Sequence, residues 1–426
     1  MQVRFWRALD RQERRELLAR PGRRVDAAIV ARVSEIIDDV EERGAAGVRD
    51  WAIKLDGHAP RTIELNARRV KDARAALTGE DIAALEIAAE NVRIFHRETK
   101  PRDIKIELRS GLVCERRWRP ISACGLYAPG GSAPLFSTLL MLAEPARAAG
   151  VGARIAVTPP MRDGDAHPMM VLAASLCELE ALFLVGGAHA IAALAFGAGL
   201  TKAEKIFGPG NAYVSEAKRQ VAARGLAAID LPAGPSELMT VADAACDAEM
   251  VAADLLSQAE HDADAQVVLI ATSIEVAEKI LAALGEQMRD LPRADIAARA
   301  LSHSFAVIVE DLEAAGAIAN EYAPEHLSLH LENAEEFSRT IENAGAIFLG
   351  AASAEVFGDY IAGPSHVLPT DSAAKVWSGV STAAFMKCIS VQRLSENGAA
   401  ALAGAAARLA RLEGLEAHAR AAELRR

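Results

Sequence analysis

The sequence predicts an α/β fold with two doubly wound, Rossmann-like units on parallel sheets, a small N-terminal arm and a helical C-terminal tail. From residue 124 to 231, short β-branched runs alternate with helical stretches, and the alternation returns from residue 265 to 350. Strand and helix in alternation imply right-handed crossovers and parallel sheets. The length of 426 residues allows two to three domains with sizeable cores.

The N-terminal part precedes this alternation. Residues 1–24 carry scattered apolar side chains among arginines, as in an amphipathic arm, and a partner subunit is one possible cover for its apolar face. Helical spacing of apolar residues predicts helices over 26–55 and 80–99. Alternating apolar residues over 104–120 predict a short antiparallel hairpin.

Each α/β unit contributes several predicted strands and helices. In the earlier unit we predict strands at 154–158, 182–185, 205–207 and 228–231, with helices starting near Met169, Ala188 and Asn211. In the later unit we predict strands at 267–271, 305–309, 327–329 and 346–349, with helices over 275–288, 312–321 and up to about Asn343. Residues 397–426 have the Ala/Leu/Arg pattern of a helix that buries little by itself.

Composition narrows the class of function. A net charge of −11 and a pI of about 5.5 argue against a nucleic-acid partner, which requires a basic surface. The five cysteines are scattered and form no Cys-x-x-Cys pair, so we expect a reduced, cytoplasmic protein without thiolate zinc. The longest apolar run, 134–148, is broken by Glu144 and Pro145, so we expect no membrane span. The Arg-rich start lacks the apolar core of a secretory signal.

Polar residues gather in Gly/Pro turns that we place at the carboxyl ends of the predicted strands, where open α/β sheets bind ligands. These turns occupy 125–131, 186–189, 208–211, 234–237, 322–326 and 358–366. None has the G-x-G-x-x-G pattern of dinucleotide-binding proteins, because the turn at 208–213 lacks the third glycine. One Gly/Pro turn is unremarkable by itself, whereas six turns that each carry a Tyr, His, Asn, Ser, Glu or Asp indicate more than chance and favour ligand binding.

Two short motifs in these regions could perform chemistry. If residues 250–261 are helical, Gln258 and His261 lie on one face and could share a metal ion, which needs further ligands from elsewhere. Glu325 and His326 are adjacent acid/base groups; alternatively, they mark a helix terminus with a solvated Glu and a packed His. Asp359 is either an oxygen ligand for the metal or a helix-start residue.

The other histidines give weaker signals, because a lone histidine is more often a packing or surface group. This alternative applies to His366 and His418, and the helical tail makes His418 look like a surface residue. We treat the histidines outside the turns as structural, namely His58, His96, His167, His303 and His330.

Taken together, the motifs closely resemble those of the histidinol dehydrogenase family. The resemblance runs from about Arg117 to His418 and keeps the order of the motifs, whereas the first hundred residues share only a general character. The matching strings are GLYAPGGSAPLFSTLLMLAEPA, VGGAHAIAALAFG, KIFGPGNAYVSEAKRQV, DLPAGPSE, ADLLSQAEH, YAPEHL, GAIFLG, GDYIAGPSHVLPT and EGLEAHA.

The resemblance implies one zinc ion per subunit and a homodimer with a shared site. The implied zinc ligands are Gln258, His261, Asp359 and His418, with His418 reaching the site of the other subunit. Glu325 and His326 would be the acid/base groups. The same zinc ligands and acid/base groups would surround the substrate, together with Ser236, His366 and Glu413.

The resemblance also implies two molecules of NAD and a four-electron oxidation of L-histidinol through L-histidinal to L-histidine, the last step of histidine biosynthesis. Tyr127, His189 and Asn211 would contact NAD, although the family usually has Gln where this chain has His189. A dehydrogenase of the same fold for another alcohol is the nearer alternative. A zinc-dependent binding protein without catalysis is the more distant one.

We divide the chain accordingly. Residues 1–24 are expected to be a dimerisation arm, and residues 25–126 together with 238–372 a first α/β domain with the metal and the catalytic groups. Residues 127–237 would form a second α/β domain on the NAD side. Residues 373–426 would be a tail domain that reaches the partner subunit.

Overall fold

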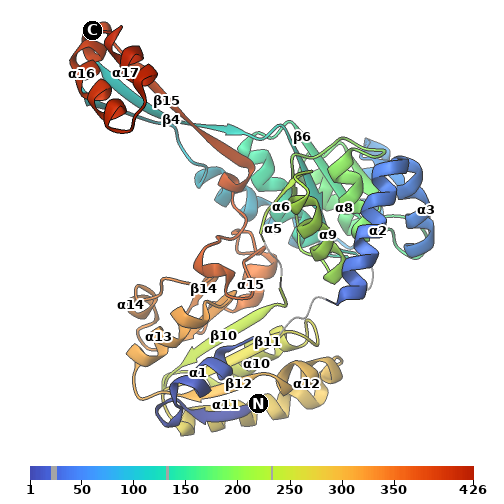
Figure 1. The fold of residues 1–426 in the computed structure, drawn as a ribbon. Coiled ribbons are helices and arrows are strands. Elements are labelled where there is room, and N and C mark those ends of the chain that lie inside the picture. Colours follow the sequence, from blue (N-terminus) through green and yellow to red (C-terminus); the bar gives the residue numbers. More distant parts are fainter. Residues whose placement is uncertain (21–25, 131–133, 232–233) are drawn as a thin grey trace.

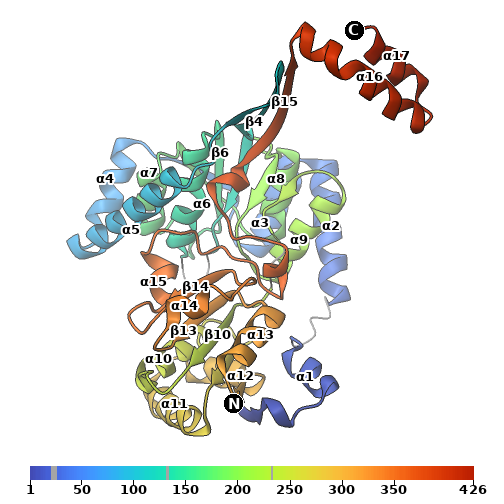
Figure 2. The same cartoon turned by 90° about the vertical axis from the view of Figure 1, so that its left-hand side faces the viewer.

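The computed structural model describes residues 1–426 except 21–25, 131–133 and 232–233 (Figure 1). Two α/β units, each with a six-stranded sheet, lie next to each other, and a three-stranded sheet with two helices projects beyond them (Figures 1 and 2). This arrangement confirms the predicted fold class. Gly131 of one predicted turn and the end of the predicted arm lie outside the described residues.

All neighbouring strands of the first sheet are parallel. Across the sheet they are β1 (Gln2–Phe5), β12 (Phe305–Ile308), β11 (Gln266–Ala271), β10 (Glu237–Ala242), β13 (His326–His330) and β14 (Ala346–Leu349). From β10 the chain winds to one side through β11 and β12, and then to the other side through β13 and β14. The sheet is therefore doubly wound, with the switch between β10 and β13.

Helices cover both faces of this sheet, which explains why every residue of β11 is buried. One face carries α10 (Ala248–Ala259), α11 (Ile274–Gln287) and α12 (Ala294–Ser302). The other carries α1 (Arg11–Leu18), α13 (Leu312–Tyr322) and α14 (Ala334–Ser338). The short helix α15 (Glu355–Tyr360) follows β14 and packs against α10.

The second sheet is parallel except at its edge strand β2, which runs antiparallel to β7. Its strands are β2 (Arg61–Glu64), β7 (Ala181–Leu184), β6 (Ala153–Thr158), β5 (Ala123–Tyr127), β8 (Lys205–Phe207) and β9 (Ala228–Ile229). One face carries α4 (Ala67–Ala75), α5 (Gly79–Glu98), α6 (Phe136–Ala149) and α7 (Pro168–Leu176). The opposite face carries α2 (Ala27–Arg43), α3 (Ala45–Leu55), α8 (Gly187–Phe196) and α9 (Ala212–Ala223).

The third sheet is antiparallel and connects the second unit to the C-terminal helices. It consists of β3 (Ile104–Arg109), β4 (Leu112–Pro120) and β15 (Met386–Leu394). Beyond it, α16 (Glu396–Leu412) and α17 (Glu416–Glu423) pack against each other at the far end of the projection (Figures 1 and 2). Leu412 is 67% exposed and Leu424 85%, so this helix pair leaves apolar surface uncovered within its own chain.

The grouping of residues 25–126 with 238–372 is wrong. Strand β2 pairs with β7, and helices α2 to α5 pack on the second sheet. The polypeptide from α2 to β9 therefore belongs mostly to one unit, and β10 starts the other. Which segments share a unit is decided by strand pairing between segments far apart in sequence. The hydrophobic periodicity within one segment does not indicate its partner.

Two N-terminal elements also differ from expectation. The first residues form β1, which pairs with β12 at the edge of the first sheet, and Leu18 of α1 is buried in that unit's core. The arm therefore packs on its own chain. The single helix predicted over 26–55 is two helices, because Gly44 adopts a φ of +59° between α2 and α3. Among the described residues, no helix has the length and apolar character needed to cross a bilayer.

If the arm is a part of the first unit, then Leu18→Ala should lower the free energy of unfolding by about 2–5 kcal/mol, because it opens a cavity in a packed core. Equilibrium urea unfolding measures this change. The control is Leu55→Ala on α3, where the side chain is 52% exposed and the expected cost is below about 0.5 kcal/mol. Equal stability of both variants would show that the arm does not pack in this core.

Candidate active site

The predicted site residues come from opposite ends of the two sheets. Tyr127 ends β5, and His189 and Asn211 follow β7 and β8, so these three lie at the carboxyl end of the second sheet as predicted. By contrast, Ser236 precedes β10 and Glu325 precedes β13, which places them at the amino end of the first sheet. The prediction that all site residues lie at the carboxyl ends of the strands is thus wrong for the first unit. There, helix α10 runs back along the sheet and brings its own C-terminus to the amino end of the strands.

The two units meet beside these residues. The backbone N–H of His366 lies 3.4 Å from Sδ of Met141 on α6, and the side-chain amide of Asn91 on α5 donates to the carbonyl of Ile361 at 2.8 Å. The segment after α15 is therefore held against two helices of the second unit.

Glu325 is a buried carboxylic acid beside the first residue of β10. Its Oε2 accepts a hydrogen bond of 2.9 Å from the backbone N–H of Glu237. Burial raises the pKa of Glu325 well above its ordinary value, and the negative charges of Glu237, Glu355 and Asp359 raise it further.

His326 is held by the backbone of the same residue, Glu237. Its Nδ1 lies 2.8 Å from the carbonyl oxygen of Glu237, and since a carbonyl only accepts, Nδ1 carries the proton. Nε2 is buried and has no hydrogen-bond partner among the described residues. Burial, with the charge of His366 as the next cause, lowers the pKa of His326 well below its ordinary value. The ring is therefore neutral and offers Nε2 as a base.

The ring of His326 stacks on that of His366, with centroids 4.4 Å apart and an interplanar angle of 17°. The carboxylate of Glu355, buried on α15, approaches both rings: its Oε1 is 3.4 Å from Nδ1 of His326 and 4.0 Å from Nε2 of His366. Burial lowers the pKa of His366 to about 4. Within the described ranges, His326, Glu355 and His366 form one group close enough to hold a cation.

Asp359 joins this group from the last turn of α15. Its Oδ1 lies 3.2 Å from Nε2 of His366, and its side chain is 39% exposed. Burial raises the pKa of Asp359 to about 6. Of the two alternatives for Asp359, the helix start is wrong, because α15 starts at Glu355. The other alternative, an oxygen ligand, stays a prediction.

Gln258 and His261 do not share one helix. Helix α10 ends at Ala259, and His261 lies in the following turn, with its N–H bonded to the carbonyl of Gln258 at 3.2 Å. The geometry of one helical face is therefore wrong for this pair. Gln258 is nevertheless buried, and its Oε1 finds no partner in the described part of the chain. Burial lowers the pKa of His261 below its ordinary value.

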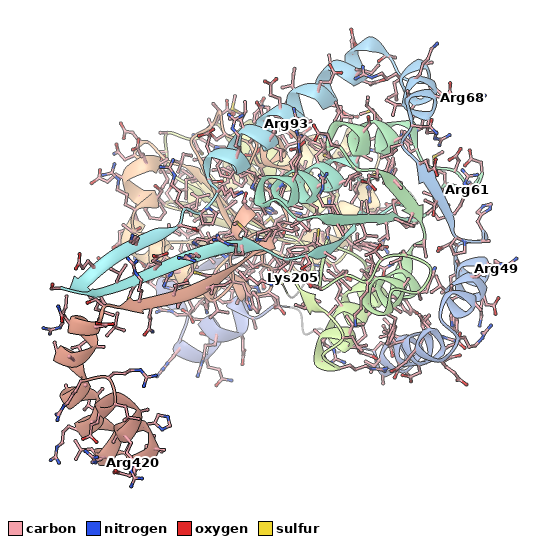
Figure 3. The ribbon with its side chains drawn as sticks, turned by 90° about the horizontal axis from the view of Figure 1, so that it is seen from above. Arg49, Arg61, Arg68, Arg93, Lys205 and Arg420 are labelled. Carbon is pink, nitrogen blue, oxygen red and sulfur yellow. The ribbon has the colours of Figure 1, made fainter. Side chains whose placement is uncertain are left out.

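His418 and Glu413 lie far from these residues in their own chain. Glu413 is the C-cap of α16, and His418 lies on α17, at the tip of the C-terminal projection. Figure 3 shows Arg420, two positions after His418, at the end of this C-terminal projection and away from Lys205 in β8. One chain therefore does not bring His418 together with Gln258, His261 and Asp359.

At the carboxyl end of the second sheet, Tyr127 and His189 support a turn. The hydroxyl of Tyr127 accepts from the N–H of Gly187 at 3.3 Å, and burial raises the pKa of Tyr127 to about 12. His189 is fully buried, and its Nε2 lies 3.0 Å from Oδ2 of Asp56, which also accepts from the N–H of Gly186 at 3.0 Å. His189 thus contacts Asp56 and is covered by protein.

The turn before α9 is built from glycine and a buried ion pair. Gly208 has a φ of +123°, and a Cβ there would lie 2.1 Å from the carbonyl oxygen of Tyr127. Asp230 and Lys218 form a buried pair and bond the N–H and the C=O of Gly208, each at 2.7 Å. Asn211 then caps α9, with Oδ1 accepting from two backbone N–H groups. Its amide nitrogen remains available to a ligand.

Three of the residues that organise the site were not predicted from the sequence. Glu237 acts through its backbone, which has no sequence signature, and Asp56 lies in a different predicted domain from His189. Glu355 did have a signal, because it precedes Asp359 by four residues and shares one face of α15.

Fold and site together define an α/β protein with a buried neutral histidine, a buried carboxyl group of raised pKa and further nitrogen and oxygen donors where its two units meet. The family model of histidinol dehydrogenase matches residues 19–426. Histidinol dehydrogenases of Xylella fastidiosa and Xanthomonas oryzae pv. oryzae are 44% and 45% identical to the chain, over 100% of it and 99% of each relative.

The crystal structure of histidinol dehydrogenase from Elizabethkingia anophelis superposes with a TM-score of 0.95 at 38% sequence identity. The match covers 100% of this chain and 98% of that one. The chain belongs to the histidinol dehydrogenase family and is an oxidoreductase.

The hydrogen bond to Glu237 predicts the tautomer and charge of His326. We expect the ring to stay neutral at pH 6.5, where an ordinary histidine is about half protonated, with its proton on Nδ1. Nitrogen chemical shifts of ¹⁵N-histidine-labelled protein report both properties, and His326→Gln identifies the signal. A ring that is half charged at pH 6.5, or that carries its proton on Nε2, would contradict the geometry.

Proposed function

We propose that this protein catalyses the zinc-dependent oxidation of L-histidinol through L-histidinal to L-histidine with two molecules of NAD, as the last step of histidine biosynthesis. The observation that carries the proposal is the buried Nε2 of His326, which has no partner in the part of the chain that the structure describes, beside the carboxyl group of Glu325 with its raised pKa. The two half-reactions need one base for an alcohol proton and one group that activates water, and these two residues supply both.

In the first half-reaction His326 is the base. As a hydride leaves the carbinol carbon for NAD, Nε2 takes the hydroxyl proton, giving the aldehyde, NADH and one proton. The other ring proton stays on Nδ1, which donates to the carbonyl oxygen of Glu237 and so keeps Nε2 available as the base.

In the second half-reaction Glu325 activates water. The carboxylate form of Glu325 takes a proton from the water that adds to the aldehyde carbon, and a second hydride then leaves for a second NAD. The products are the carboxylate, NADH and two protons. NAD supplies the redox chemistry, and the protein positions the reacting atoms.

We propose Gln258, His261 and Asp359 of one chain and His418 of the partner subunit as the zinc ligands. Nitrogen and oxygen donors suit zinc, and the buried Oε1 of Gln258 has no partner in the described ranges, as expected of a ligand atom. A bound zinc ion would anchor the amine and imidazole of the substrate as a Lewis acid. This choice leaves His326 free as a base. Ser236, His366 and Glu413 would contact the substrate.

We propose that NAD binds at the carboxyl end of the second sheet, near Tyr127 and Asn211. A cavity of about 480 Å³ opens after β6 at this end of the sheet, lined in part by Gly130, Thr158 and Pro159; Tyr127 and Asn211 are not part of its lining. Because Nε2 of His189 contacts Asp56, we propose that His189 supports the turn at 186–187, so that the family's glutamine is replaced without loss of NAD binding.

The proposed homodimer accounts for the projecting tail. His418 and Glu413 lie too far from the proposed site of their own chain to contribute to it. The exposed apolar side chains of α16 and α17 suit burial on a second chain. A tail that crosses to the partner subunit would complete two identical sites, as closed twofold symmetry requires.

The proposal predicts two NADH formed per L-histidinol consumed, measured by absorbance against substrate depletion. Removal of metal by a chelator should abolish the reaction, and added zinc should restore it. One NADH per substrate would contradict the four-electron reaction. Full activity of protein verified to be metal-free would contradict the zinc assignment.

The shared site predicts complementation between inactive chains. Gln258→Ala and His418→Ala should each lose nearly all activity, and mixed dimers should regain some, because every hybrid contains one intact site of its two. Differently tagged chains allow isolation of the hybrids, and a hybrid of Gln258→Ala with Asp359→Ala is the matched control without an intact site. Confirmed hybrids of the first kind without activity would argue against sharing.

A further inference from the structure

The N-terminal arm contributes a buried arginine to the support of the catalytic pair. Arg20 follows α1, and its Nε and Nη2 donate to Oε1 and Oε2 of Glu237 at 2.9 and 2.8 Å. The side chains are 12% and 2% exposed, so water screens this bidentate pair little. Among the described residues, Arg20 is the one cationic side chain paired with Glu237.

Other contacts hold the guanidinium in this orientation. It stacks over the ring of Tyr322 at 3.5 Å, and its Nη1 bonds the hydroxyl of Ser372. The ring of Tyr322 is itself fixed, because its hydroxyl donates to Gln266 on β11 at 2.7 Å. The arm is thereby joined to the end of α13, which leads directly to Glu325 and His326.

The residue that Arg20 holds is the one whose backbone N–H and C=O hold the proposed catalytic pair. The N–H of Glu237 donates to Glu325, and its C=O accepts from His326. A shift of Glu237 therefore moves both groups at once, and a displacement of about 1 Å can cost a factor of about 100 in rate.

We propose that Arg20 is a positioning residue of the active site, which acts through Glu237 on Glu325 and His326. The inference rests on the catalytic roles proposed for Glu325 and His326. Arg20 touches neither the substrate nor the reacting atoms.

Charge gives Arg20 a second effect. Glu237 is buried beside Glu325, and without a cation its negative charge would be uncompensated. Glu237 would then move toward water, and this movement disturbs the backbone that holds Glu325 and His326.

Four variants separate positioning from general stability. Arg20→Met removes the guanidinium, and Arg20→Lys keeps the charge without the two-pronged geometry. Arg20→Met with Glu237→Gln removes both charges of the pair. Arg14→Met is the matched control, since Arg14 lies on the same arm over Trp6 and bonds only the carbonyl of that residue among the described residues.

Steady-state oxidation of L-histidinol is measured per folded site. We expect Arg20→Met to lower kcat by about 10- to 100-fold with a change in KM below about threefold, since the affected groups act in the chemical step. Arg20→Lys should lie between Arg20→Met and the wild type, the double variant should recover part of the loss, and Arg14→Met should match the wild type. Wild-type kcat in Arg20→Met, or in Arg20→Lys if Arg20→Met does not fold, would overturn the proposal.

A second readout does not depend on activity. The ¹⁵N signal of Nδ1 of His326 should shift in Arg20→Met and stay unchanged in Arg14→Met, because only the former disturbs the hydrogen bond to Glu237. An unchanged signal would overturn the proposal even if the wild type did not oxidise L-histidinol. Absence of NADH formation by the wild type would instead refute the proposed function.

Discussion

The backbone of Glu237 is the constraint on which the site depends. Its N–H and C=O point to Glu325 and His326, and they fix one oxygen of the carboxyl group and the tautomer of the imidazole at the same time. The backbone of a residue at the start of a central strand is a rigid support, since β10 pairs on both sides with β11 and β13. Burial raises the pKa of Glu325 and lowers the pKa of His326, and the hydrogen bonds to the backbone of Glu237 oppose both shifts.

The arrangement of the two units explains why the proposed site takes its residues from several helices, strands and turns of both units. The first sheet presents its amino end and the second its carboxyl end, so helix termini and turns from both units supply the functional groups. The carboxyl end of a parallel sheet is the usual place for a nucleotide, and the second unit retains this use in our proposal. The first unit places acid/base residues at the opposite end, where α10 and α15 end close to the start of β13.

Much of the fold was predictable because it depends on local periodicity. Alternating strands and helices after residue 153 were found within a few residues of their observed bounds, as with β6 and β14. The pairing of β2 with β7 was not, because residues 61–64 have no local feature that names their partner. Strand β10 was not predicted either, although every residue in it is buried.

The site was predictable where side-chain chemistry carries the signal and unpredictable where tertiary structure does. Glu325 and His326 stood out as adjacent acid/base groups, and the structure brings His366 and Asp359 to them. The role of Glu237 depends on backbone atoms that every residue has, so no sequence pattern could reveal it. His189 shows the converse: its sequence position predicted a cofactor contact, whereas its side chain turns to Asp56.

In our proposal, a site held by Glu237 in one chain is completed by the C-terminal tail of the partner subunit. The most direct test is a crystal structure of the zinc-loaded protein with anomalous diffraction at the zinc edge. We expect one zinc ion per chain, bound by Gln258, His261 and Asp359 together with His418 of the partner subunit. We also expect no metal on Nε2 of His326. Zinc among His326, Glu355 and His366, or a tail folded onto its own chain, would contradict it.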